Sequence, residues 1–429
     1  MSFILYLCFI VSFFLHLTAR FPALGSLRLD LLLMTLTLVT MALTKIHHFR
    51  LSESKPSRAL VAFVIYVIAA IPLVTYPGSV VHVGLANFAK VVPFFFFTIY
   101  LVDTGKKLKV FVGVFLLCQV FRTMESLYLH VREGYWGSVA YSASGGEGSS
   151  LLRLASSPMD VLNPTQFGWL IISHLIFLYY LFWNGSKIKK LIFACYAPLA
   201  LYTFLLTGAR SGMICLLFVL MQIIWYSEKR KKALILGVIL LVPVVIVASV
   251  KMGPALQTRY LSIVKKDVAG SDTAMGRING LKRNFENVLN SPVVGHGIGT
   301  TREVNYNTIG SAQITHNMYF EIMQETGILG FCIFMVYIKY LLSSLYSLRK
   351  CLSEQRPPGF YYHISTALIV WIQMHLLYTF SCFSLNRWEW YLIGGLAVAC
   401  CRIASISLGE SKVEPCDNAI YNAPIIQAT

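Results

Sequence analysis

The chain has 429 residues, of which 56% are hydrophobic and only 13% carry a charge. A typical soluble domain has about 25% charged residues, so this composition excludes a water-soluble enzyme, and it equally excludes a disordered chain, collagen and a coiled coil. The net charge of +17 can reflect either membrane orientation or an anionic partner, depending on where the basic residues lie along the chain. The remaining class is a membrane protein that crosses the bilayer several times.

Apolar runs long enough to approach a bilayer crossing recur along nearly the whole sequence, which predicts an all-α bundle of about twelve transmembrane helices. The first run has no basic residues before it and is therefore expected to be a membrane helix rather than a cleaved signal peptide. We expect the helices at 2–18, 30–44, 59–75, 84–102, 108–122, 164–183, 191–207, 212–226, 233–250, 318–346, 360–382 and 388–406.

The basic residues between these helices indicate the orientation of the chain. If the N-terminus is cytoplasmic, each short inner loop carries three or four Lys or Arg, whereas the short outer turns carry at most one, as the positive-inside rule requires. We therefore expect nine helices over 1–250 with a long outer loop at 123–163. A second, larger outer loop follows at 251–316, then three helices over 317–406 and a cytoplasmic tail at 407–429.

The outer loop at 251–316 is cationic, with eight basic residues against four acidic ones, a net of +4. Such a surface suggests an anionic partner, for example a phosphate or pyrophosphate; a loop that is merely soluble is the equal alternative. Within the loop, apolar residues recur at helical spacing and predict an amphipathic helix over 273–290 that ends before Pro292. Arg277 would lie at the edge of its apolar face.

The most informative segment begins at His316, where the tenth predicted helix starts at the outer surface. Asn317, Glu321 and Gln324 fall on one face of this helix, and polar residues at such a position must face protein, water or substrate rather than lipid. His316 lies at the mouth of this polar stripe and could serve as a base or as a hydrogen-bond donor. A histidine that only marks the end of a membrane span is the alternative.

Two further basic residues stand out. Arg210, in the outer turn at 207–212, opposes the charge bias, and a guanidinium suits a diphosphate; an interfacial arginine whose stem lies along the bilayer is the competing reading. Lys90 lies about two turns inside the fourth helix, one turn from Asn87. An ammonium at that depth is a functional candidate, although it could equally extend to the outer interface.

Sequence signatures of metal and nucleotide chemistry are missing from the sequence. It contains no HExxH, P-loop or G-x-S-x-G pattern, and the outer loops contain no D-x-D metal site. The glycine-rich stretch 295–299 lacks the preceding strand and following helix of a dinucleotide site, so we interpret it as a turn. We therefore expect neither a metal nor another cofactor.

Together these segments resemble the bacterial O-antigen ligase and O-antigen polymerase superfamily. One pattern of that family is His-[Asn/Ser/Gln], nine residues, Gly, two residues, Gly. It is met here by His316, Asn317, Gly327 and Gly330.

Other parts of the chain match the family in order and spacing. The turn at 207–212 resembles the arginine-bearing turn of the family, and Arg277 with the segment 290–297 resembles its large periplasmic loop. The segment 87–90 is similar to a basic membrane-helix segment of some ligases. The resemblance covers roughly 190–345, and the rest of the chain is matched by topology alone.

The resemblance implies a metal-independent, inverting membrane glycosyltransferase of the GT-C type. Its donor would be a glycan on undecaprenyl pyrophosphate at the periplasmic face of the bacterial inner membrane, and no nucleic acid would be involved. Arg210 and Arg277 would hold the pyrophosphate, whose charge grows as the sugar–phosphate bond breaks. His316 would orient or deprotonate the acceptor hydroxyl. The supporting, substrate-binding residues would be Asn317, Glu321 and Lys90.

The resemblance leaves the acceptor open. A ligase, acting in lipopolysaccharide biosynthesis, uses a lipid A–core sugar, and a polymerase of O-antigen, capsule or exopolysaccharide uses another lipid-linked repeat. The His-Asn pattern is best known from ligases and favours that reading. A polysaccharide or lipid flippase is a more distant alternative. The scarcity of carboxylates in mid-membrane positions argues against an ion-coupled transporter.

Overall fold

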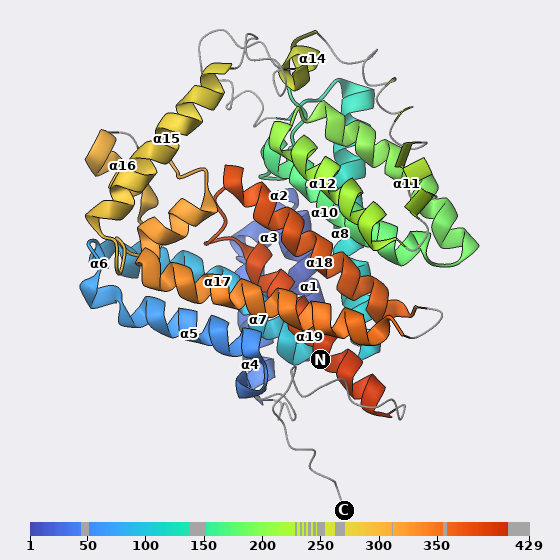
Figure 1. Ribbon diagram of the computed structural model, residues 1–429, viewed down its shortest axis with the longest axis horizontal. Helices are drawn as coiled ribbons and strands as arrows, with labels where there is room; N and C mark the ends of the chain where they lie inside the picture. The colour runs from blue at the N-terminus through green and yellow to red at the C-terminus, as the bar shows by residue number, and fades with distance from the viewer. Residues whose placement is uncertain are drawn as a thin grey trace, which may run out of the picture. The chain divides into compact units, whose positions relative to one another are not determined.

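The computed structural model describes residues 1–43, 51–137, 152–227, 254–261, 271–310, 312–354 and 358–410, together with single residues between 230 and 246. Every regular element in this part of the chain is a helix (Figure 1). The described residues divide into two compact units. Unit 1 comprises 1–40 and 109–274, and unit 2 comprises 41–108 and 275–429.

Seven of the described helices are long and apolar enough to cross a membrane. They are Pro77–Leu101, Gly105–Glu133, Pro164–Trp183, Lys187–Leu206, Met318–Leu352, Phe360–Ser381 and Trp388–Leu408. Three shorter apolar helices accompany them: Ser2–Leu15, Leu29–Leu43 and Arg210–Tyr226. The prediction of an all-α, multi-pass membrane bundle is confirmed. Of the twelve predicted helices, the one at 233–250 lies mostly outside the described residues.

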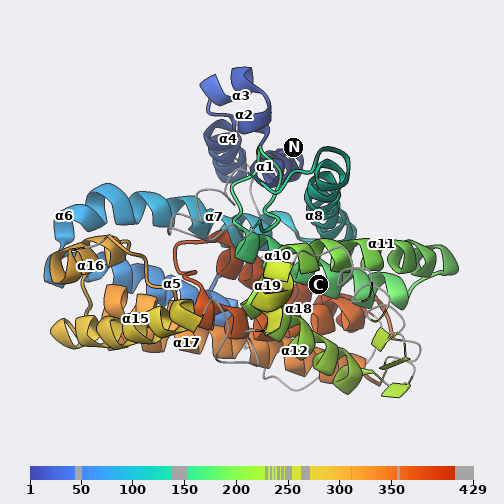
Figure 2. The same cartoon turned by 90° about the horizontal axis from the view of Figure 1, so that it is seen from above.

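Unit 1 is built on α10 (Pro164–Leu178), which packs against both α11 (Lys187–Leu206) and α12 (Arg210–Tyr226); the three helices are labelled in Figures 1 and 2. The start of α10 follows from its sequence. Asn163 and Gln166 form a reciprocal capping box around Pro164 at the first turn.

The remaining helices of unit 1 include α1 (Ser2–Leu15) and α8 (Gly105–Glu133), which contact through aromatic pairs such as Phe14 with Phe115. Helix α8 continues eleven residues beyond the predicted end at 122, so the first part of the segment expected as loop is helical. The short helices of this unit are α2 (Leu17–Arg20), α3 (Pro22–Ser26), α4 (Leu29–Leu43) and α14 (Pro254–Leu261).

Unit 2 is organised around α17 (Met318–Leu352), which packs against α5 (Lys55–Ala69), α18 (Phe360–Tyr378) and α19 (Trp388–Glu410). Helix α19 also packs closely on α7 (Leu85–Leu101), because Gly395 leaves room for Thr98. The segment before α17 contains α15 (Ser271–Asn290) and α16 (Thr301–Ile309). The predicted amphipathic helix at 273–290 is therefore confirmed.

Candidate functional site

Asn317 fixes the N-terminal end of α17. Its side chain accepts a hydrogen bond from the Phe320 N–H (3.1 Å) and donates one to the carbonyl of Phe380 (3.2 Å). An asparagine at this position satisfies one of the orphan N–H groups of a helix end. His316 precedes it and is exposed, whereas Asn317 is buried. The cap thus fixes the backbone next to the exposed histidine.

Two carboxylates on α17 are buried and accept backbone hydrogen bonds. Glu321 accepts from the N–H groups of Ser384 (2.8 Å) and Leu385 (3.1 Å). Glu325 accepts from the Gly299 N–H (2.8 Å) and from the Thr301 hydroxyl (2.6 Å). Because buried polar groups need partners, these bonds tie the loop before α19 and the turn before α16 to one face of α17.

Gln324, on the same face, is also fully buried, and its side-chain oxygen accepts a hydrogen bond from the Thr315 hydroxyl (3.2 Å). The stripe predicted at Asn317, Glu321 and Gln324 therefore faces protein. This agrees with the requirement that it avoid lipid.

The glycine-rich stretch 295–299 is a turn, as the sequence indicated. Gly295, Gly297 and Gly299 all have positive φ. The turn docks on α17 through the N–H groups of His296 and Gly297, which donate to the carbonyls of Gln324 (2.8 Å) and Glu325 (2.9 Å).

Gly327 explains part of the family pattern. It interrupts α17 with φ 65° and ψ −174°, a conformation that is essentially restricted to glycine. A Cβ here would overlap the carbonyl of Val293. Because glycine has no Cβ, the chain at 292–293 comes close to the helix, and the Ile328 N–H donates a hydrogen bond to the Pro292 carbonyl (2.9 Å). The glycine is thus needed for the segment at 292–294 to pack against the helix.

The sequence interpretation missed several polar residues that support this end of α17. The His296 ring bonds the Thr75 hydroxyl (3.0 Å) and the Asn287 carbonyl (2.9 Å). The Asn287 side chain in turn donates to Asn305 (2.8 Å). The sequence signal for this network was the set of asparagines along the predicted amphipathic helix. Their spacing alone does not show which residues their side chains contact.

Arg210 is the first residue of α12 and belongs to unit 1, whereas His316 belongs to unit 2. The turn before α12 is held by two arginines from separate segments. The Arg153 Nε donates to the carbonyl of Thr207 (2.9 Å), and the Arg259 Nε donates to that of Gly208 (2.9 Å). Arg153, Arg210 and Arg259 are all partly exposed. Of these three arginines, the sequence analysis predicted only Arg210 to be functional.

Arg277 and Lys90 complete the set of predicted residues. The backbone of Arg277 lies in α15, within unit 2. Lys90 is exposed on α7, where its ammonium donates to the Asn87 side chain (3.3 Å). Among the residues that the structure describes, no group of three or more His, Cys, Asp or Glu side chains is placed to hold a metal ion.

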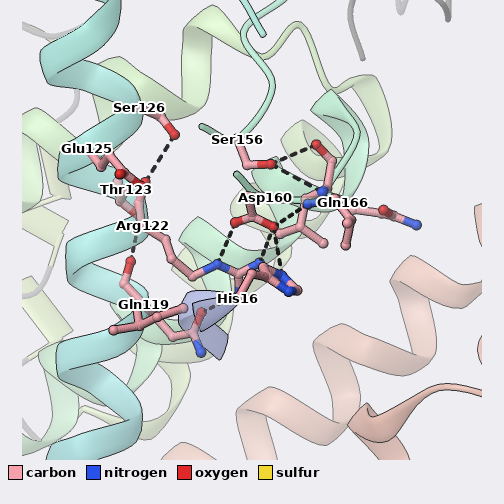
Figure 3. Close-up of polar contacts among 12 residues, drawn as sticks. His16, Gln119, Arg122, Thr123, Glu125, Ser126, Ser156, Asp160 and Gln166 are labelled. Atoms are coloured by element: carbon pink, nitrogen blue, oxygen red, sulfur yellow. Dashed lines mark hydrogen bonds and ion pairs between the residues drawn. The ribbon is translucent and has the colours of Figure 1, made fainter. Parts of the chain in front are cut away.

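A buried ion-pair cluster fixes the segment 152–163 within unit 1 (Figure 3). Asp160 accepts two hydrogen bonds from Arg122 of α8, at 2.6 and 2.8 Å, and its carboxylate lies 3.2 Å from the His16 ring. Burial by itself would raise the pKa of Asp160, but the charge of Arg122 and the hydrogen bonds from His16 and Arg122 hold it well below its usual value.

Replacing Asp160 by alanine is expected to destabilise the protein by about 3–5 kcal/mol, because Arg122 would remain as an unpaired buried charge. The measurement is unfolding of the purified protein in detergent. Asp103→Ala is the matched control, because its pair with Lys107 is exposed and contributes less than about 1 kcal/mol. Equal effects of the two substitutions would contradict the prediction.

The same pair predicts a pH dependence. Since the pKa of Asp160 is lowered in the folded protein, its contribution to stability is present above the unfolded pKa of about 4. It is lost as the pH falls from there toward the folded pKa. The stability of the Asp160→Ala variant should therefore fall less on acidification than that of the wild type.

These features define a multi-pass membrane protein with a buried polar cluster at one end of α17 and an arginine-rich turn at the start of α12. Residues 195–335 match the family model described as O-antigen ligase. The resemblance to the O-antigen ligase and polymerase superfamily is thereby confirmed, and the family implies a glycosyltransferase-like ligase or polymerase activity with lipid-linked glycan substrates. The matched segment contains Arg210, Arg277, His316, Asn317 and Glu321. No curated protein matches the chain.

Proposed function

We propose that the protein is an inner-membrane glycosyltransferase of the O-antigen ligase type. It transfers a glycan from undecaprenyl pyrophosphate to a sugar hydroxyl of lipid A–core at the periplasmic face. The observation that carries the proposal is the family match over 195–335, which contains both proposed pyrophosphate ligands and the proposed base. The cationic outer loop and its amphipathic helix are consistent with an anionic, membrane-bound donor.

In the proposed reaction, the acceptor oxygen attacks the anomeric carbon while the bond from that carbon to the pyrophosphate oxygen breaks. Attack opposite the leaving group inverts the anomeric configuration, and undecaprenyl pyrophosphate departs with the bonding electrons. Arg210 and Arg277 stabilise the charge that develops on this leaving group. His316 accepts the proton of the acceptor hydroxyl or orients it. No metal is needed in this scheme.

The surroundings of α17 refine the roles of the supporting residues. Asn317 and Glu321 are buried, and both side chains bond to other parts of unit 2. They therefore act as positioning residues for His316 rather than as direct substrate contacts. Lys90 is exposed and remains available as a weaker contact to a lipid phosphate.

Two other functions differ in measurable ways. A repeat-unit polymerase of the same superfamily would use the same donor with a lipid-linked acceptor, and a flippase would move the donor without breaking a bond. The family match favours transfer over transport.

The test is deletion of the gene followed by electrophoresis of lipopolysaccharide and analysis of lipid-linked intermediates. A ligase predicts loss of all O-chains with accumulation of lipid-linked polymer. Core bearing a single repeat indicates a polymerase instead, and an unchanged profile excludes O-antigen as the product. Failure of any glycan intermediate to reach the periplasmic face would indicate a flippase.

A further inference from the structure

Helix α15 exposes large apolar side chains although it buries polar ones. Asn284 and Asn287 are buried, whereas the side chains of Phe285 and Leu289 are 51% and 59% exposed. A helix on the surface of a soluble domain typically has the opposite arrangement, with its apolar stripe facing the core. Phe285, Leu289 and the nearby Val293, which is 53% exposed, form what we call the outer apolar strip.

The buried asparagines fix this orientation of α15. The Asn284 side-chain oxygen accepts a hydrogen bond from the Thr315 hydroxyl (3.3 Å), and the Asn287 amide donates one to the Asn305 side chain (2.8 Å). Because buried polar groups need partners, rolling the helix to bury Phe285 would break both bonds. The exposure of the outer apolar strip is therefore a property of the folded unit 2.

The outer apolar strip continues onto the membrane-spanning part of α17. The carbonyls of Pro292 and Val293 accept hydrogen bonds from the N–H groups of Ile328 (2.9 Å) and Leu329 (3.4 Å). Ile328 and Leu329 are exposed at the start of that part, and Val336 is exposed two turns further along. Exposed apolar side chains of a helix that spans a bilayer face lipid. The strip therefore adjoins a lipid-facing surface of the same unit.

The exposed face of α15 is apolar along one edge and polar along the other. At 3.6 residues per turn, the exposed Lys282, Glu286 and Asn290 lie beside the outer apolar strip. The helix also runs obliquely to α17 rather than along it (Figure 1). Such a face fits the boundary between hydrocarbon and water, where interfacial helices lie. In an interface with a second copy, both charged side chains would need partners, and that copy would also have to cover Leu329.

We propose that α15 lies in the headgroup layer of the bilayer, with the outer apolar strip inserted among the phospholipid chains. An apolar helix face of this kind reaches about 5–10 Å into the boundary between headgroups and acyl chains. One consequence rests on the function proposed above. The backbone of Arg277 lies about 12 Å along the helix before Phe285, so docking of α15 holds this proposed pyrophosphate ligand near the lipid phosphates.

The experiment introduces the photoreactive residue p-benzoylphenylalanine in place of Phe285, which it resembles in shape. The full chain is purified into nanodiscs of phosphatidylethanolamine and phosphatidylglycerol and illuminated, and mass spectrometry identifies the molecule attached at this position. Phospholipid should be the main adduct. Its yield should exceed that at a water-facing control position by about 10-fold or more, because burying a large apolar side chain is favourable by at least that factor.

The matched control places the same photoreactive residue at Tyr306, an exposed aromatic residue of α16. Arg302, one turn earlier, and Asn307 beside it are also exposed, so this position should face water and give little lipid adduct. Equal phospholipid yields at the two positions would overturn the inference. A cross-linked dimer as the main product at Phe285 would identify a second copy as the occupant and overturn it as well.

Folding of each variant is checked by thermal unfolding. If the chain substituted at Phe285 does not fold, the photoreactive residue replaces Leu289 instead, with the same expected adduct and the same outcomes against the inference.

The nanodiscs contain no glycan donor, so the adduct does not depend on the proposed activity. A chain that forms the adduct but transfers no glycan would refute the proposed function and leave the docking of α15 in place. Replacing Phe285 and Leu289 together by glutamine should lower transfer by about 10-fold or more, since a shift of about 1 Å in a catalytic group can cost about 10²-fold. Unchanged transfer in that variant would overturn the link to Arg277.

Discussion

Replacing His316 by alanine is expected to abolish glycan transfer in a protein that still inserts into the membrane. The side chain is exposed, and the hydrogen bonds that define the start of α17 come from its neighbour Asn317, so the fold should survive. Loss of a general base costs roughly 10²–10⁴-fold in rate. The measurement is transfer from a lipid-linked glycan by the purified variant, together with the cellular glycan profile.

The matched control for this substitution is His82→Ala. His82 is an exposed histidine outside the matched segment, and its loss should leave transfer unchanged. Arg210→Ala and Arg277→Ala should also abolish transfer, because in the proposed mechanism each removes a cation from the departing pyrophosphate, an effect of roughly 10²–10³-fold for one oxyanion donor. Wild-type glycan profiles in all three variants would refute the mechanism.

Gly327→Ala is expected to have the second large effect, in this case on folding. Its φ of 65° with ψ −174° is closed to alanine, and the added Cβ would overlap the Val293 carbonyl. Either the helix or the loop at 292–295 must move, which would break the backbone bonds of Ile328, His296 and Gly297. We expect a loss of about 3 kcal/mol or more, measured as the unfolding of the purified variant in detergent.

A second glycine provides the comparison. Gly280 lies within α15, and a Cβ there would meet no atom within 4 Å. Gly280→Ala should be neutral or stabilising by up to about 1 kcal/mol, because alanine is the better helix former. If both alanine variants unfold alike, the conformation of Gly327 is not what makes it necessary.

The sequence predicted the membrane class and most helices because hydrophobic length is a strong, local signal. It also predicted that Asn317, Glu321 and Gln324 avoid lipid and face protein, water or substrate, and the structure shows that they are buried in protein. The ends of helices were less predictable. Helix α8 continues to Glu133 rather than ending at 122, because polar residues that end an apolar run do not by themselves end a helix.

Long-range partners could not be obtained from the sequence. Arg122 and Asp160 are separated by 38 residues, and Arg259 lies 51 residues from Gly208. No periodicity relates such pairs, because side-chain spacing along one helix says nothing about another segment. Glu325 likewise accepts a hydrogen bond from the turn at 295–299, a contact that its position along α17 does not predict.

The interruption at Gly327 has a consequence for where the chemistry can take place. From Ile328 to Leu352, α17 is roughly 37 Å long at 1.5 Å per residue, which alone exceeds the hydrocarbon thickness of about 30 Å. The preceding turns, with Asn317, Glu321 and Glu325, need not enter the hydrocarbon at all. They can rest at the level of the lipid headgroups, where the two substrates of the proposed reaction, a water-soluble sugar and a membrane-bound isoprenoid, can meet without either leaving its own solvent.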